Sequence, residues 1–173
     1  SSKPDVYALQ RAKDNGINGL VLERKKYPDV ASYSKAMAEL LTAEKADLVV
    51  YAGFLTILDG TVCRAFPHKM INVHPALIPS FCGKGFYGLH VHEAALEKGV
   101  KVTGATVHFV TEECDGGPII LQKAVEVKNT DTPETLQKRV MEEAEWIILP
   151  EAVKLFCEGR ITVTDGRAYI DGN

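Results

Sequence analysis

The segment Met70-Ile71-Asn72-Val73-His74-Pro75 constrains the fold of this chain more than any other. Its apolar residues predict a short buried strand, and Pro75 makes the chain turn directly after it. Asn72 and His74 are two positions apart, so both side chains should point to the same side of that strand. Further along the chain, Asp115-Gly116-Gly117-Pro118 supplies a carboxylate in a turn. An amide, an imidazole and a carboxylate at strand ends suit an acyl-transfer site that uses neither a metal nor a covalent nucleophile.

Strand and helix patterns alternate on both sides of this segment. The run from Asp47 to Ala52 is almost continuously apolar, as in a strand buried on both faces of a parallel sheet. Further strand-like stretches cover 17–22, 70–73, 101–110 and 119–127, and helical stretches cover 5–15, 30–45, 60–66, 90–98 and 132–159. This order predicts a three-layer, Rossmann-like α/β fold, with a mostly parallel central sheet and helices on both faces.

Capping and turn residues refine these boundaries. Asp5 is expected to cap the first helix, and Thr132 with Pro133 to begin the last long one, which should kink or break at Pro150. Asp165-Gly166 predicts a type I′ turn in a β-hairpin that joins 161–164 to 167–170. The stretch 75–88 is a long loop rich in glycine and proline, and we expect it to move with ligand or pH.

Composition excludes several classes of protein. The chain has 173 residues, 46% of them hydrophobic, and a net charge of −3, which suits a single domain over 1–173. The sequence has no broad basic field, which argues against a nucleic-acid partner. No apolar run approaches the roughly 20 residues that span a membrane. The four scattered cysteines form no CxxC pair and predict free thiols in a reducing cytoplasm.

Taken alone, the polar residues leave other roles open. Asn72 and His74 could serve only backbone groups at the strand end, and Asp115 could be an ordinary turn residue. His90 and His92 are two positions apart on a helix, which does not put them on one face, so no metal site is expected. His108 is interpreted as a structural or supporting histidine.

Four ordered segments, 71–79, 88–94, 104–110 and 115–120, together resemble phosphoribosylglycinamide formyltransferase, and the likeness covers essentially the whole chain. The resemblance implies a folate-dependent transferase of one-carbon metabolism. It would pass the formyl group of its co-substrate 10-formyltetrahydrofolate to the amine of 5-phosphoribosylglycinamide, in de novo purine biosynthesis. Attack would be direct, through a tetrahedral intermediate, without a metal. The resemblance leaves a homodimer open.

The same resemblance implies roles for particular residues. Catalysis falls on Asn72, His74 and Asp115, with Asp115 keeping His74 charged. Contacts with the substrate ribonucleotide fall on Glu142 and Glu145. Folate contacts fall on two loops and on one catalytic residue: Leu55, Thr56, Ile57, Leu58, Asn72, Thr111, Glu112, Glu113, Cys114 and Asp115.

The chain also departs from the family pattern. Many members have Arg where this chain has Thr56, one extra residue lies between Arg139 and Glu145, and Trp146 replaces a frequent His. The N-terminal strand and phosphate-binding loop of the family are expected to be missing, which would impair the chain on its own. Two alternatives therefore remain: a 10-formyltetrahydrofolate hydrolase, and a non-catalytic folate-binding remnant.

Overall fold

The structure is a computed structural model that describes residues 1–172. The chain divides into two compact units. Unit 1 consists of Ser1–Asp47 and Gly53–Pro67, and unit 2 consists of Leu48–Ala52 and the chain from His68 onward. The single domain over 1–173 stays a prediction.

Unit 1 is helical, with α1 (Tyr7–Asp14), α2 (Val30–Ala43), α3 (Gly60–Ala65) and one 3₁₀ turn, η1 (Arg24–Lys26). The Asp59 side chain caps α3 by accepting a hydrogen bond from the Thr61 N–H at 2.8 Å. The Asp59 N–H in turn donates to Ser34 Oγ of α2 at 2.9 Å, which joins the two helices. Two predictions are wrong here: Val6, not Asp5, occupies the cap position of α1, and 17–22 forms no strand. Their hydrogen bonds go to separate partners, Ser1, Ala12 and Tyr33, and form no strand ladder.

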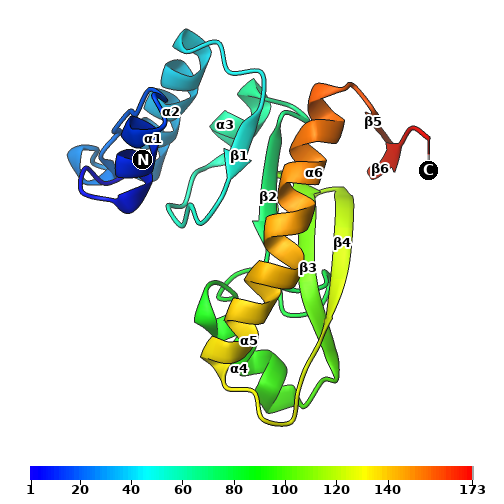
Figure 1. Cartoon of the computed structure of the whole chain (residues 1–173). Helices are drawn as coiled ribbons and strands as arrows, with labels where there is room; N and C mark the ends of the chain where they lie inside the picture. Colours follow the sequence, from blue (N-terminus) through cyan, green and yellow to red (C-terminus); the bar gives the residue numbers. More distant parts are fainter. Residues whose placement is uncertain (173) are drawn as a thin grey trace. The chain divides into compact units, whose positions relative to one another are not determined.

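Unit 2 is built on a four-stranded sheet (Figure 1). Its strands are β1 (Val49–Tyr51), β2 (Met70–His74), β3 (Val102–Phe109) and β4 (Ile119–Glu126), in the order β1-β2-β3-β4. The β1–β2 pair is parallel, whereas the β2–β3 and β3–β4 pairs are antiparallel. The prediction of an α/β fold is confirmed, but the mostly parallel sheet is wrong, because the sheet is mixed. The expectation that β1 is buried on both faces is also wrong, since Val50 is exposed.

The connections between strands explain the mixed sheet. After β2, the loop and α4 (Leu89–Lys98) stay near the carboxyl end of that strand instead of crossing the sheet (Figure 1). β3 therefore starts beyond His74 and runs back along β2. The segment 110–118 between β3 and β4 is too short to contain a crossover helix, so this pair is antiparallel as well.

One long helical segment covers the apolar face of the sheet. It consists of α5 (Pro133–Val140), a π-helical turn η2 (Met141–Glu145) and α6 (Trp146–Cys157). The Thr132 side chain caps α5, as predicted, and Pro133 fills its first turn. The helix does not break at Pro150, which lies inside α6. The irregularity is instead the π turn, which accommodates one extra residue in the stretch where the sequence predicted one.

The hydrophobic core lies between this helical segment and the sheet. Its strand residues include Ile71, Val107 and Phe109, and its helix residues include Ala144 and Ile148. The predicted C-terminal hairpin is confirmed as β5 (Ile161–Thr164) and β6 (Arg167–Ile170). Asp165 and Gly166 both have positive φ, at 51° and 72°, as a type I′ turn requires.

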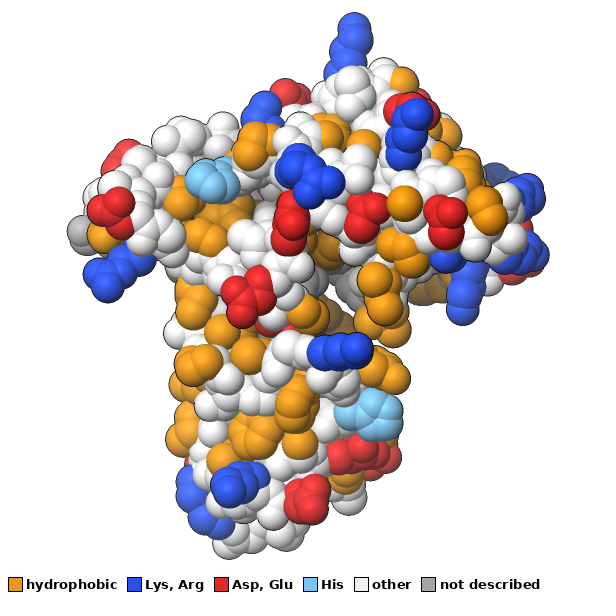
Figure 2. Space-filling model, turned by 180° about the vertical axis from the view of Figure 1, so that it is seen from behind, with side chains coloured by type: hydrophobic (Ala, Val, Ile, Leu, Met, Phe, Trp, Pro, Cys, Tyr) orange, Lys and Arg blue, Asp and Glu red, His pale blue; other side chains and the backbone are white. Residues whose placement is uncertain are grey.

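The surface mixes the two signs of charge. On the face seen in Figure 2, acidic and basic side chains are interspersed among apolar ones. Among residues 1–172, no helix is both long and apolar enough to cross a bilayer.

Two valines on β3 test the position of this core. Val107 is fully buried, whereas Val102 on the same strand is 53% exposed. We expect Val107→Ala to lower the free energy of unfolding by about 2–3 kcal/mol, from lost apolar burial and a residual cavity. Urea denaturation of both variants measures the difference. An equal loss in the control Val102→Ala would contradict the assigned core.

Candidate active site

One face of the sheet in unit 2 is polar. Asn72 and His74 share a face of β2, and the register with β3 places His108 opposite Asn72 and Thr106 opposite His74. Directly opposed residues of an antiparallel pair lie on the same face, so all four side chains gather there. Ile71 alternates with these residues and lies in the hydrophobic core.

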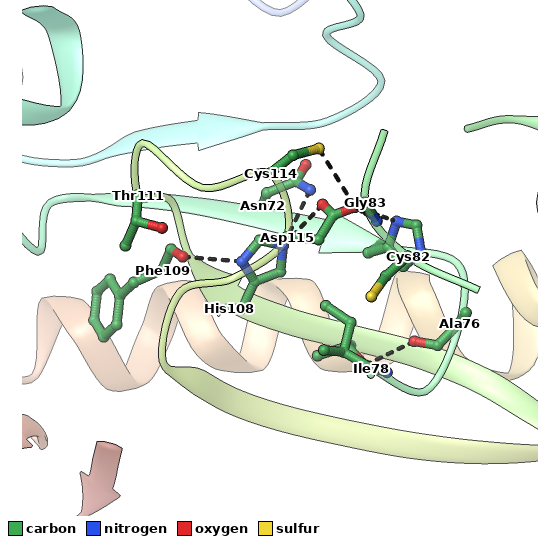
Figure 3. Close-up of polar contacts among 12 residues, drawn as sticks. Asn72, Ala76, Ile78, Cys82, Gly83, His108, Phe109, Thr111, Cys114 and Asp115 are labelled. Atoms are coloured by element: carbon green, nitrogen blue, oxygen red, sulfur yellow. Dashed lines mark hydrogen bonds and ion pairs between the residues drawn. The ribbon is translucent and has the colours of Figure 1, made fainter. Parts of the chain in front are cut away.

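Asn72 and Asp115, two of the three residues predicted to be catalytic, are linked through His108 (Figure 3). Asn72 Nδ2 lies 3.3 Å from His108 Nε2, and His108 Nε2 lies 3.6 Å from Asp115 Oδ1. The other carboxylate oxygen of Asp115, Oδ2, lies 3.6 Å from His74 Nδ1. Asn72, His74 and Asp115 therefore lie in one polar cluster. The sequence predicted only a structural or supporting role for His108, because the pairing register that makes it the central member cannot be read from β3 alone.

The backbone fixes the tautomer of His108. Its Nδ1 lies 2.9 Å from the carbonyl oxygen of Phe109, so Nδ1 carries the proton and donates. Nε2 faces both the Asn72 amide and Asp115 Oδ1: without a proton it accepts the amide N–H, and with one it donates toward the carboxylate.

His74 lies between two acceptors. It is only 4% exposed, with Nε2 2.8 Å from the carbonyl oxygen of Phe81 and Nδ1 facing Asp115. Burial lowers the pKa of His74, although the Phe81 hydrogen bond and the Asp115 charge both act to raise it. The expectation that Asp115 keeps His74 charged is therefore wrong in its net direction, because desolvation of the ring is the larger effect.

Asp115 is a buried, ionised carboxylate. Its side chain is 10% exposed, and Oδ2 accepts a hydrogen bond from the Gly83 N–H at 2.8 Å. Burial raises its pKa, but His108, the Gly83 N–H and His74 outweigh that effect and lower the pKa to about 2. At neutral pH the site therefore contains a fixed negative charge beside two imidazole rings.

The loop over this face supplies two of these partners from its backbone. Phe81 and Gly83 stand on either side of Cys82, and both have positive φ. The glycines at 83, 85 and 88 have the spacing G-x-G-x-x-G, which is typical of dinucleotide-binding loops. No strand leads into them, so the structural context of a dinucleotide site is missing. Here the first glycine serves Asp115 instead.

The residues predicted to contact folate fall in both units. In unit 2, residues 111–115 form the connection from β3 to β4, where the Thr111 hydroxyl donates to the Glu113 carbonyl oxygen at 3.2 Å. Glu112, Glu113 and Cys114 are exposed there. In unit 1, residues 55–58 precede α3, with Leu55 and Ile57 exposed and the Thr56 hydroxyl donating to Ser2 Oγ at 2.9 Å. Their role in folate binding stays a prediction.

The two predicted substrate-binding glutamates lie on η2, which covers the apolar face of the sheet. Glu142 is exposed and forms an ion pair with Lys138 at 3.8 Å. Burial raises the pKa of Glu145 to about 7. Within residues 1–172, neither glutamate bonds to Asn72, His74 or Asp115, so their role in substrate binding stays a prediction.

His92 on α4 is a buried histidine to which the sequence assigned no function. It is fully buried, and in the described part of the chain neither ring nitrogen has a hydrogen-bond partner. Burial, together with the nearby His74, lowers the pKa of His92 from 6.5 to about 4. Among residues 1–172, no group of His, Cys, Asp or Glu side chains is arranged to hold a metal ion.

Comparison with known proteins adds to this geometry. A family model described as formyl transferase matches residues 1–153. The chain is 41% identical to the chloroplastic phosphoribosylglycinamide formyltransferase of Arabidopsis thaliana over 162 residues, covering 93% of this chain and 55% of that protein. It therefore spans little more than half of that relative.

Two crystal structures are similar along most of the chain. Glycinamide ribonucleotide transformylase 1 from Symbiobacterium toebii is 43% identical with a TM-score of 0.90, and the match covers 98% of this chain and 77% of that one. A formyltetrahydrofolate deformylase from Pseudomonas syringae pv. tomato is 30% identical with a TM-score of 0.80, and covers 93% and 52%.

The pKa of His92 predicts a pH-dependent stability. Because the folded pKa lies below the ordinary value, the unfolded chain binds a proton more readily between these two pKa values. We expect the free energy of unfolding to be highest, as far as His92 decides it, above pH 6.5. It should decrease as the pH falls toward about 4. The loss amounts to about 3 kcal/mol.

Urea denaturation at several pH values measures this contribution. His92→Leu should flatten the fall in unfolding free energy between about pH 6.5 and about pH 4. His90→Leu, at an exposed position on the same helix, is the matched control. If His92→Leu keeps the steepness of the wild-type curve, burial of a neutral His92 does not explain the acid sensitivity.

Proposed function

This chain belongs to the formyl transferase family, and from that premise we propose that it transfers a formyl group from 10-formyltetrahydrofolate to the amine of 5-phosphoribosylglycinamide. The observation that carries the proposal is the cluster of Asn72, His108, Asp115 and His74 on one polar face. These side chains offer an amide donor, imidazole rings and a carboxylate around one position, without a covalent nucleophile. The step belongs to purine biosynthesis, and its folate co-substrate needs no metal.

In the proposed reaction, the amine nitrogen bonds to the formyl carbon and the formyl oxygen gains a negative charge. The Asn72 amide and His74 donate hydrogen bonds to this oxygen. The intermediate then collapses as the carbon–nitrogen bond to the folate breaks. The departing nitrogen gains a proton and the amine loses one, with Asp115 assisting the transfer through water.

The proton on His74 is the variable part of this mechanism. Only the imidazolium form keeps the hydrogen bond from Nε2 to Phe81 while its Nδ1–H, 3.6 Å from Asp115, donates to the formyl oxygen, and burial opposes that form. Negative charge on the formyl oxygen would offset the cost of burial, so protonation of His74 is favoured as the intermediate forms. Stabilisation of this kind acts on the transition state more than on the bound substrate.

Several finer assignments remain part of the proposal. The loops 55–58 and 111–115 are proposed to contact the folate, with Asn72 and Asp115 at its reactive end. Glu142 and Glu145 are proposed to contact the ribonucleotide, and the pKa of Glu145 near 7 suits a carboxyl that gains charge beside an amine. The homodimer and the cytoplasmic location stay predictions.

A second candidate function is hydrolysis of 10-formyltetrahydrofolate. The similarity to a formyltetrahydrofolate deformylase favours it, because water could replace the amine at the same cluster. We prefer transfer because the segments 74–79 and 115–118 follow the transferase pattern. The third candidate, a folate-binding remnant without catalysis, differs from both in predicting no turnover.

Removing the amide donor tests the catalytic cluster. We expect Asn72→Ala to lower kcat of formyl transfer by about 100- to 1000-fold, as is typical for loss of one oxyanion donor. His74→Ala should lower it at least as far. Steady-state assays with both substrates measure the loss, and Thr103→Val on the opposite side of β3 is the control. Wild-type turnover in Asn72→Ala would remove Asn72 from the mechanism.

Formate release separates transfer from hydrolysis. With 10-formyltetrahydrofolate alone, the wild-type chain should release formate slowly, and adding the amine should yield formylated product much faster. Because water and amine compete for the same carbon, the ratio of formate to product measures the preference. Fast formate release that the amine does not suppress would favour the hydrolase, and no turnover of either kind would favour the remnant.

A further inference from the structure

The turn that follows His74 is bonded to the sheet by two side chains outside the proposed catalytic set. Thr106 of β3 pairs with His74 on one side and with Gln122 of β4 on the other. The three residues therefore form a row across the polar face. Neither Thr106 nor Gln122 was singled out by the sequence, because their partners are backbone groups far along the chain.

Thr106 uses its full hydrogen-bonding capacity in this row. The hydroxyl is fully buried, donates to the Ala76 carbonyl oxygen at 2.7 Å and accepts the Ile78 N–H at 3.0 Å. It also accepts from Gln122 Nε2 at 2.9 Å. One donor and two acceptor positions are all that a hydroxyl has. Any loosening of the turn would leave a buried polar group without a partner.

Gln122 completes the attachment. Its Nε2 also donates to the Ile78 carbonyl oxygen at 3.0 Å. One amide hydrogen therefore bonds to Thr106 and the other to the turn at residues 76–78. Gly104, two positions before Thr106, allows a close approach on this face: an added Cβ would clash with the Lys123 carbonyl oxygen of β4 and lie 2.9 Å from Leu77 Cδ2. The Thr106 hydroxyl, the Gln122 amide and the close approach at Gly104 thus fix residues 76–78 against β3 and β4.

The turn at residues 76–78 determines the position of the residues that follow it. The chain leaves Ile78 and reaches Phe81, whose carbonyl oxygen accepts from His74, and Gly83, whose N–H donates to Asp115. Displacing residues 76–78 would therefore move the acceptor of the imidazole and a donor of the carboxylate together. We propose that Gln122 and Thr106 are positioning residues that set the protonation and orientation of His74 through this turn. The expected effect on kcat rests on the proposed function, whereas the expected effect on the titration of His74 does not.

The test uses near-isosteric variants of the 173-residue chain. Gln122→Leu and Thr106→Val remove the hydrogen bonds and keep the volume, whereas Thr106→Ser keeps the hydroxyl. Thr103→Val is the matched control, since Thr103 is a buried threonine on the same strand whose hydroxyl has no partner among residues 1–172. Gln122 is the milder position because it lies at the exposed edge of the sheet, so it carries the test if Thr106→Val does not fold.

Two readouts are expected to change. In formyl-transfer assays, Gln122→Leu and Thr106→Val should lower kcat by about 10- to 100-fold with little change in KM, as for a misplaced catalytic group. In NMR titrations, with the His74 signal assigned by its loss in His74→Gln, both variants should lower the pKa of His74, because the Phe81 acceptor favours its charged form. Thr106→Ser and Thr103→Val should match the wild type in both readouts.

The outcomes separate this inference from the proposed function. If the wild type transfers the formyl group, wild-type kcat and an unshifted His74 titration in folded Gln122→Leu and Thr106→Val would overturn the inference. If the wild type has no turnover, the proposed function fails. The titration then decides alone: a lower His74 pKa in both variants supports the positioning role, and an unshifted one overturns it.

Discussion

An ionised carboxylate that is removed from water must be surrounded by donors, and Asp115 imposes that requirement on unit 2. The Gly83 N–H satisfies one of its oxygens, and two histidines approach from β2 and β3. Each of these partners is held by something else: His108 by the Phe109 carbonyl, His74 by the Phe81 carbonyl, and the loop by Thr106 and Gln122. The geometry of the candidate site and local stability therefore depend on the same few hydrogen bonds.

The mixed sheet is what allows this arrangement. Because β3 runs antiparallel to β2, its residues lie directly opposite those of β2, and His108 faces Asn72 across the pair. A parallel crossover would have carried the chain over a face of the sheet. Instead, the loop after β2 remains at its carboxyl end and folds back over the polar side chains, while the opposite face is left to the long helical segment.

Local features were predictable from the sequence, and pairings between distant segments were not. The hairpin at 161–170 follows from Asp165-Gly166, whose backbone preference is independent of the rest of the chain. Asn72, His74 and Asp115 could be predicted as candidate site residues because their polar side chains stand beside Pro75 and the glycines. The direction of β3, the central place of His108 and the role of Gln122 depend on register, which adjacent residues do not encode. The net pKa direction of His74 depends on burial, which the sequence does not state.

The π turn at Met141–Glu145 has a consequence for how this protein tolerates changes in length. In a regular α-helix, an inserted residue turns every following side chain by about 100° around the axis, because 3.6 residues complete one turn. A π turn absorbs the insertion within one widened coil, so Ile148 and Ala152 still meet the sheet. Only the phase of the residues inside the coil is changed, and Glu145 is its last member. Loss of one residue at this point would therefore change the direction of the carboxyl groups inside the coil and leave Ile148 and Ala152 packed on the sheet.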